Sequence, residues 1–297
     1  MKYILTVASA GLFLLSGCQK EKIRQDNAAD GSLRISIISS GMNYGITTES
    51  ETNIHTLDAY HFENGILSKS FNSLQIDEKG VCRLDIKQKN GMLYFLANDA
   101  NITSRANLTN NVTTLEEFLQ LTATADEMTS KSLLMSGHTE LDGENASLSV
   151  SLKRTVARID LESAFQDAEV NSITIRDIAL IGLVNEGGNK SVLTNIEKTD
   201  LTKDFGEQPF KNKKESLYYL PEQTSNGHEV EIMMTANGGW HRLRTTLPAL
   251  KRNTVYTLRV YGNGANLNVE VLTDNWESGD SSASGLTLKG LVDKENS

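Results

Sequence analysis

The chain is short of residues that staple or stiffen a fold. It has 297 residues but only two cysteines, Cys18 and Cys82, and three prolines. At most one disulfide could form, and none can if Cys18 is modified, so packing and hydrogen bonding must stabilise the fold. Cys82 lies in the stretch Val81–Leu84, which is typical of a strand interior, and we expect its thiol to be buried.

A basic cluster is also missing. Lysine and arginine number 29 against 38 aspartates and glutamates, and the net charge of -9 is spread along the chain, so we expect no nucleic-acid partner. The five histidines lack the spacing of zinc ligands, which predicts no metal and no cofactor. The sequence contains no nucleophile elbow and no calcium loop. We therefore expect that the protein is not an enzyme.

Long apolar runs are confined to the N-terminus. Lys2, the apolar run Ile4–Leu15 and the sequence Leu15-Ser16-Gly17-Cys18 follow the order of a secretory signal peptide. The run is too short for the ~30 Å hydrocarbon layer, which needs ~20 residues. Leu-Ser-Gly-Cys resembles the lipobox of bacterial lipoproteins, which implies cleavage before Cys18 and acylation of that residue. An ordinary signal peptide followed by an incidental cysteine is the alternative.

Short stretches of alternating apolar and polar residues fill most of the remaining chain. We expect strands at 33–37, 54–62, 66–71, 73–76, 81–86, 92–97, 133–138, 146–152, 155–161, 217–221, 229–235, 240–246, 254–261 and 267–272. Strands at roughly ten-residue spacing favour β-sandwiches over a parallel α/β sheet. The sequence thus predicts an all-β fold with this order: signal peptide 1–17, flexible tether 18–31, β-sandwich domain 32–154, β-sandwich domain 155–279, and tail 280–297 with one more strand.

Three segments depart from the strand pattern. Ser39–Asn53 and residues 195–215 are polar and are predicted to be long loops. Thr114–Leu121 is predicted to be a helix, because Thr114 can cap its first turn and Glu117 follows three residues later.

Several segments together resemble one known family. They are the lipobox, LDAYHFENGILSKSF, LYFLANDAN, LLMSGH, SLKRTVARIDL and NTVYTLRVYGNGANLNVEVLTDNWESGD. In this order they resemble the fimbrillin superfamily, the lipoprotein pilins and pilus anchors of Bacteroidota. The resemblance implies two transthyretin-like β-sandwich domains with short helical insertions. It also implies a lipid anchor on Cys18 in the outer membrane, display on the cell surface, and other pilus subunits as partners.

The resemblance further implies assembly by β-strand exchange. In the structural pilins, an arginine-specific protease removes the first strand, and a strand from a neighbouring subunit fills the groove. Here the removable or retained N-terminal strand would carry Leu33, Ile35 and Ile37. The candidate C-terminal donor strand would carry Leu286, Leu288 and Leu291. An intramolecular edge strand and a disordered tail are the plainer interpretations of these two segments.

One feature departs from the family pattern. No arginine lies between Arg34 and Arg83, and the first lysine after Arg34 is Lys69, so the loop Ser39–Asn53 offers no site for such a protease. Either another protease matures the protein, or the strand and the lipid are retained, as in an anchor or accessory subunit. Both interpretations stay open at this point.

Two functions outside assembly are also considered. A surface lipoprotein could bind a glycan if Tyr218, Tyr219 and Trp240 formed an exposed aromatic platform. A lipoprotein hydrolase would need histidines and carboxylates converging in a cleft, and the sequence indicates none.

Overall fold

The computed structural model describes residues 32–39, 49–87, 89–144, 147–165, 167–225, 227–263, 266–276, 288–289 and 291–293. The signal peptide, Cys18, the tether 18–31 and Leu286 lie outside this range, so the predictions made for them stay predictions. None of the helices in the described ranges is long and apolar enough to cross a membrane.

Strands from the first half of the chain form one seven-stranded sheet, in the order β3-β2-β5-β7-β8-β1-β4. They are β1 (Ser32–Ser39), β2 (Leu57–Glu63), β3 (Ile66–Phe71), β4 (Val81–Asp85), β5 (Asn90–Ala97), β7 (Met135–Asp142) and β8 (Ser147–Arg154). β7 and β8 pair at only two positions, Met135 with Arg154 and Ser136 with Lys153. The two halves of the sheet enclose a core that includes Leu33, Phe95 and Leu152.

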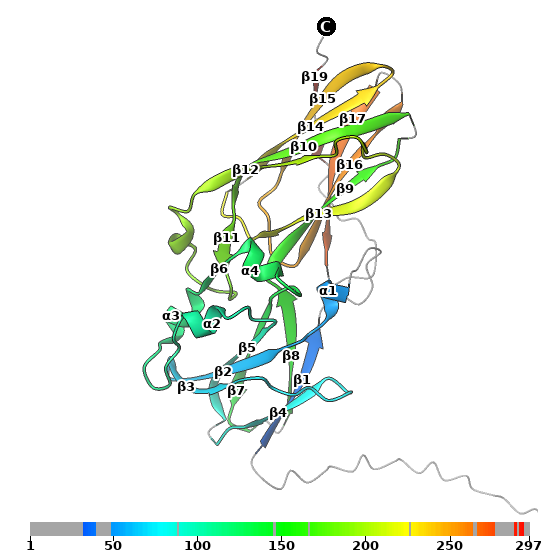
Figure 1. The fold of residues 1–297 in the computed structure, drawn as a ribbon. Helices are drawn as coiled ribbons and strands as arrows, with labels where there is room; N and C mark the ends of the chain where they lie inside the picture. The colour runs from blue at the N-terminus through cyan, green and yellow to red at the C-terminus, as the bar shows by residue number, and fades with distance from the viewer. Residues whose placement is uncertain are drawn as a thin grey trace, which may run out of the picture. The chain divides into compact units, whose positions relative to one another are not determined.

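Strands from the second half form two five-stranded sheets, in the orders β12-β10-β14-β15-β19 and β13-β9-β16-β17-β18 (Figure 1). They are β9 (Val156–Ser163), β10 (Ala168–Ala179), β12 (Lys198–Asp204), β13 (Lys213–Pro221), β14 (His228–Ala236), β15 (Gly239–Leu247), β16 (Thr254–Asn263), β17 (Asn266–Asn275), β18 (Leu288–Lys289) and β19 (Leu291–Asp293). A large apolar core, with residues from both sheets, makes this a sandwich. The small ladder of β6 (Thr122–Thr124) and β11 (Ile181–Leu183) stands apart from both sheets.

The helices are few and short, so the all-β class is confirmed. They are α1 (Glu49–Thr52), α2 (Ile102–Arg105), α3 (Leu115–Leu119), α4 (Ala125–Thr129) and the 3-10 turn η1 (Lys190–Leu193). The predicted capping box is present at α3. The Thr114 hydroxyl accepts from the Glu117 amide, and the Glu117 carboxylate accepts from the Thr114 amide at 2.8 Å.

Three predictions of local structure are wrong. Residues 73–76 form no strand, although the Leu74 amide donates to the Leu57 carbonyl. The predicted loop Ser39–Asn53 ends in α1, and the predicted loop 195–215 contains β12 and the start of β13. β12 escaped notice because it is an edge strand whose only partly buried residue is Leu201, so it shows no apolar alternation.

The strands group on either side of Thr155. β8 ends at Arg154 in the seven-stranded sheet, and β9 begins at Val156 in the sandwich. The division into domains 32–154 and 155–279 stays a prediction.

The tight hairpin at Glu63-Asn64-Gly65 is present, with φ of 51° at Asn64 and 77° at Gly65, which is the geometry that favours Asn-Gly.

The capping box gives a stability prediction. Thr114→Ala removes the hydroxyl that accepts from the Glu117 amide, and we expect a loss of about 1 kcal/mol in the free energy of unfolding. Urea unfolding followed by circular dichroism measures it. Thr56→Ala, at an exposed threonine outside any helix or strand, is the control and should change stability less; equal losses would contradict the capping role.

Candidate functional site

β1 lies in the interior of the seven-stranded sheet, between two strands that are distant in sequence. It pairs antiparallel with β4 at five positions, Ser32–Ser36. It pairs parallel with β8 at six positions, Arg34–Ser39 (Figure 1). Within the described residues, β4 pairs with β1 and with no other strand. β1 therefore connects β4 to the rest of the sheet.

The side chains of β1 alternate as a half-buried strand requires. Leu33 and Ile35 are fully buried, and Ile37 is partly buried against the same core. Ile38, which points to the other face, is 53% exposed. The pattern follows from the two-residue period of a strand. Leu33, Ile35 and Ile37 thus face the core, and removal or exchange of the strand that carries them stays a prediction.

Cys82 lies opposite Ile35 in the β1–β4 register and is buried. Burial raises the pKa of the Cys82 thiol to about 11, because an apolar environment disfavours the thiolate. It is the free cysteine of the described ranges, as expected from its sequence context. Its side chain belongs to the core that β1 covers.

The C-terminal segment is held less extensively. β18 pairs with β17 at two positions, and β19 pairs with β15 at three. The two strands lie in different sheets of the sandwich, with Leu288 opposite Val271 and Leu291 opposite Arg244. The sequence predicted one more strand here. It gave no sign that the chain passes from one sheet to the other.

A buried charge cluster follows β1 and was missed by the sequence reasoning. Glu51 of α1 is fully buried, and its carboxylate accepts hydrogen bonds from Arg158 at 3.1 Å and from the Tyr219 hydroxyl at 2.7 Å. Arg158 also pairs with the buried Asp160 at 3.0 Å. Burial, together with the Glu51 carboxylate, raises the pKa of Tyr219 to about 12. The polar residues of Ser39–Asn53 predicted a long loop, and they gave no indication that Glu51 is buried.

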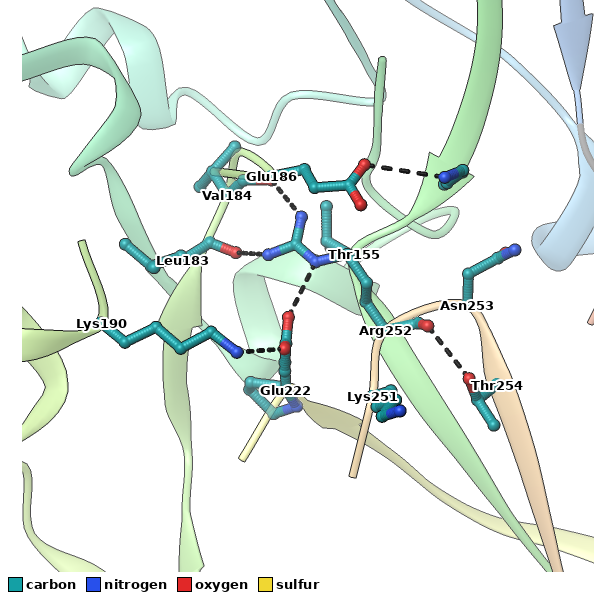
Figure 2. A network of polar contacts seen from close by, with 12 residues as sticks. Thr155, Leu183, Val184, Glu186, Lys190, Glu222, Lys251, Arg252, Asn253 and Thr254 are labelled. Atoms are coloured by element: carbon teal, nitrogen blue, oxygen red, sulfur yellow. Dashed lines mark hydrogen bonds and ion pairs between the residues drawn. The ribbon is translucent and has the colours of Figure 1, made fainter. Parts of the chain in front are cut away.

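A second polar cluster surrounds Arg252. Its guanidinium donates to the carbonyls of Leu183 and Val184 and pairs with Glu222, which also binds Lys190 at 2.6 Å (Figure 2). The two cations hold the pKa of Glu222 below its ordinary value although burial opposes them. Arg252, Glu222, Lys190 and Leu183 line a pocket of about 750 Å³. Because Arg252 and Glu222 satisfy each other, the contacts fasten the turn after β11 to the connection before β16.

The three aromatic residues considered for glycan binding do not form one platform. Tyr218 packs against the sandwich core, and Tyr219 stacks on the buried Trp276 with ring centroids 6.1 Å apart. Trp240 is 59% exposed, but it lies on β15, in the other sheet from β13. The glycan-binding alternative therefore loses the exposed aromatic platform on which it rested.

No group of three or more histidines, cysteines or carboxylates able to hold a metal occurs among the described residues.

Comparison with solved structures identifies the fold. The tip fimbrial protein Mfa3 from Porphyromonas gingivalis, with a C-terminal truncation, is 14% identical with a TM-score of 0.55; the match covers 82% of this chain and 100% of that one. A fimbrial assembly protein from Parabacteroides distasonis ATCC 8503 is 15% identical with a TM-score of 0.52, covering 87% and 98%. The chain shares the fold of these two fimbrial proteins. No protein-family model and no curated protein matches the sequence.

The resemblance stated from the sequence is thus confirmed at the level of the fold, which the chain shares with the two fimbrial proteins. At these identities the likeness concerns architecture alone.

The alternation of β1 yields a paired prediction. Ile35→Ala deletes buried atoms between β1 and β4, and we expect a loss of about 2–5 kcal/mol in the free energy of unfolding. Ile38→Ala, the matched change on the exposed face, should stay within about 0.5 kcal/mol. Urea denaturation of both variants decides the matter. Similar losses would show that β1 is not seated as described.

Cys82 provides a second prediction. In a Cys18→Ser chain Cys82 is the single thiol, and iodoacetamide should label it slowly at pH 8, where both burial and the raised pKa suppress the thiolate. Loosening β1 with Ile35→Ala should raise the labelling rate roughly tenfold or more, while Ile38→Ala should not. Equal labelling rates in all three chains would contradict this arrangement.

The raised pKa of Cys82 also affects stability. Because the folded-state pKa is raised, the thiol's contribution to the free energy of unfolding is complete below the ordinary value of 9.0 and falls as the pH rises towards 11.

Proposed function

We propose that the protein is a structural component of a surface pilus, without catalytic activity, assembled by β-strand exchange. On this proposal a lipid on Cys18 anchors it to the outer membrane, and other pilus subunits are its partners. The observation that carries the proposal is the position of β1. This strand pairs with β4 along residues 32–36 and with β8 along residues 34–39, and it is the first strand of the described ranges, yet it closes a core that later strands supply.

The physics of strand exchange fits this position. Without β1, β8 and β4 would each present unpaired amide and carbonyl groups along an apolar groove, which is unstable in water. A donor strand restores the hydrogen bonds and fills the sites of Leu33, Ile35 and Ile37 with its own apolar side chains. The fold shared with a tip fimbrial protein and a fimbrial assembly protein supports the same role.

The C-terminal segment is the donor on this proposal. Its strands are held by fewer pairs than β1, so they are released at lower cost. Leu286 and Leu288 share a face of a regular strand, whereas Leu291 falls on the opposite face. If all three residues fill one groove, the donor therefore needs a bulge near Gly290.

The subunit's place in the pilus depends on whether β1 stays. The absence of arginine and lysine from 35–68 favours a retained strand and a retained lipid, and so an anchor or accessory subunit. A stalk or tip subunit matured by a protease of other specificity is the second form of the same proposal. An adhesive role is proposed only as a consequence of pilus formation.

Intact mass and N-terminal sequencing of the protein from its native envelope test the proposal. An acylated Cys18 at the N-terminus would show that β1 is retained and that the subunit is an anchor or accessory component. A start within residues 40–48 would show that β1 is removed and that the subunit polymerises. If the purified protein neither polymerises nor joins any pilus in either form, the proposed function is wrong.

A further inference from the structure

The segment that follows β1 is fastened by a different kind of contact from β1 itself. The Ser50 carbonyl accepts from the Leu133 amide at 3.0 Å, and the Glu51 carbonyl accepts from the Arg154 guanidinium at 3.0 Å. The Asn53 carbonyl accepts from the Asn98 side chain at 2.8 Å. These partners come from β8 and from the segments that follow β5 and α4.

The Glu51 carboxylate contacts residues of strands that follow Thr155 in the sequence. Its partners Arg158 and Tyr219 belong to β9 and β13 of the sandwich, while Arg154 ends β8 of the seven-stranded sheet. The guanidinium carbons of Arg154 and Arg158 lie 4.5 and 5.1 Å from the ring centroid of the buried Trp276. One residue of α1 thus binds strands of both sheet systems.

Four buried residues in this cluster carry charges of opposite sign. Glu51 and Asp160 are acidic and Arg154 and Arg158 are basic, and the partly exposed Lys214 lies 3.6 Å from the Asp160 carboxylate at the edge of the cluster. Breaking a buried pair by removing one partner is strongly unfavourable, because the other charge is left without compensation. If the segment around Glu51 left its place, Arg158 would lose one of its two carboxylates inside the protein.

We propose that the cluster around Glu51 is a clamp that ends the exchangeable segment at α1. Strand exchange then affects β1 alone, and residues 50–53 stay in place and keep β8, β9 and β13 joined while the groove is empty or refilled. This inference rests on the proposed function for its biological meaning. Its structural content, that α1 is held by Glu51 and not by β1, stands independently.

The test is hydrogen–deuterium exchange on the full chain, comparing peptides that cover β1 with peptides that cover residues 50–53. Glu51→Gln removes the charge and keeps the size of the side chain, so uptake at 50–53 should rise while uptake in β1 changes little. Ile35→Ala should have the opposite effect, with faster uptake in β1 and unchanged uptake at 50–53. Glu140→Gln, the same chemical change at an exposed residue of β7, should alter neither.

Uptake in β5, from the centre of the same sheet, separates local loosening from global unfolding. A second chain with a recognition sequence for a site-specific protease between Asn43 and Tyr44 tests the clamp after cleavage. Slow uptake at 50–53 in the cleaved chain is the expected result.

Two outcomes would overturn the proposal: equal loosening of α1 and β1 by Ile35→Ala, or unchanged uptake at 50–53 in Glu51→Gln. Failure of the native protein to join a pilus would remove the proposed function and leave the clamp standing. Fast uptake at 50–53 in cleaved protein that still joins a pilus would remove the clamp alone.

Discussion

The structure depends on the backbone pairing of β1. Because β1 is the one described partner of β4 and the parallel partner of β8, the second half of the seven-stranded sheet exists only while that position is filled. Full burial of Leu33 and Ile35 contributes about 1.5–3 kcal/mol each, and the ladder satisfies the backbone on both sides. A position that must be filled, occupied by the first strand of the described ranges, is consistent with the proposed exchange.

The ladder of β1 and the charge cluster around Glu51 stabilise the fold by different kinds of contact. The contacts of β1 are backbone ladders and alternating apolar side chains, which are features that any strand of suitable alternation shares. The contacts of Glu51 are specific, because loss of its buried carboxylate leaves Arg158 with one carboxylate partner inside the protein and the Tyr219 hydroxyl without its acceptor. On the proposed function, β1 could therefore be exchanged while the contacts of Glu51 keep the neighbouring strands joined.

The sequence predicted the parts of the fold that have strong periodicity. The alternation at 33–37, the Asn-Gly turn and the box of Thr114 and Glu117 are local signals, and each is present. β12 and α1 were missed, because β12 is a polar edge strand and α1 is held by partners such as Arg158 that lie over one hundred residues away. No local pattern shows that Glu51 is buried against Arg158, because the two residues are far apart in the sequence.

The same distinction applies to the C-terminal segment, which we propose as the donor strand. β18 and β19 are short, they lie in different sheets, and five paired positions hold them against eleven for β1. A segment that is to leave its own subunit must be weakly held there and strongly held in the groove it fills. Strong alternation in the free sequence would stabilise it at home or favour aggregation. Weak periodicity at the C-terminus is consistent with a segment that is weakly held in its own subunit, and it is also why the sequence predicted one strand where the structure has β18 and β19 in different sheets.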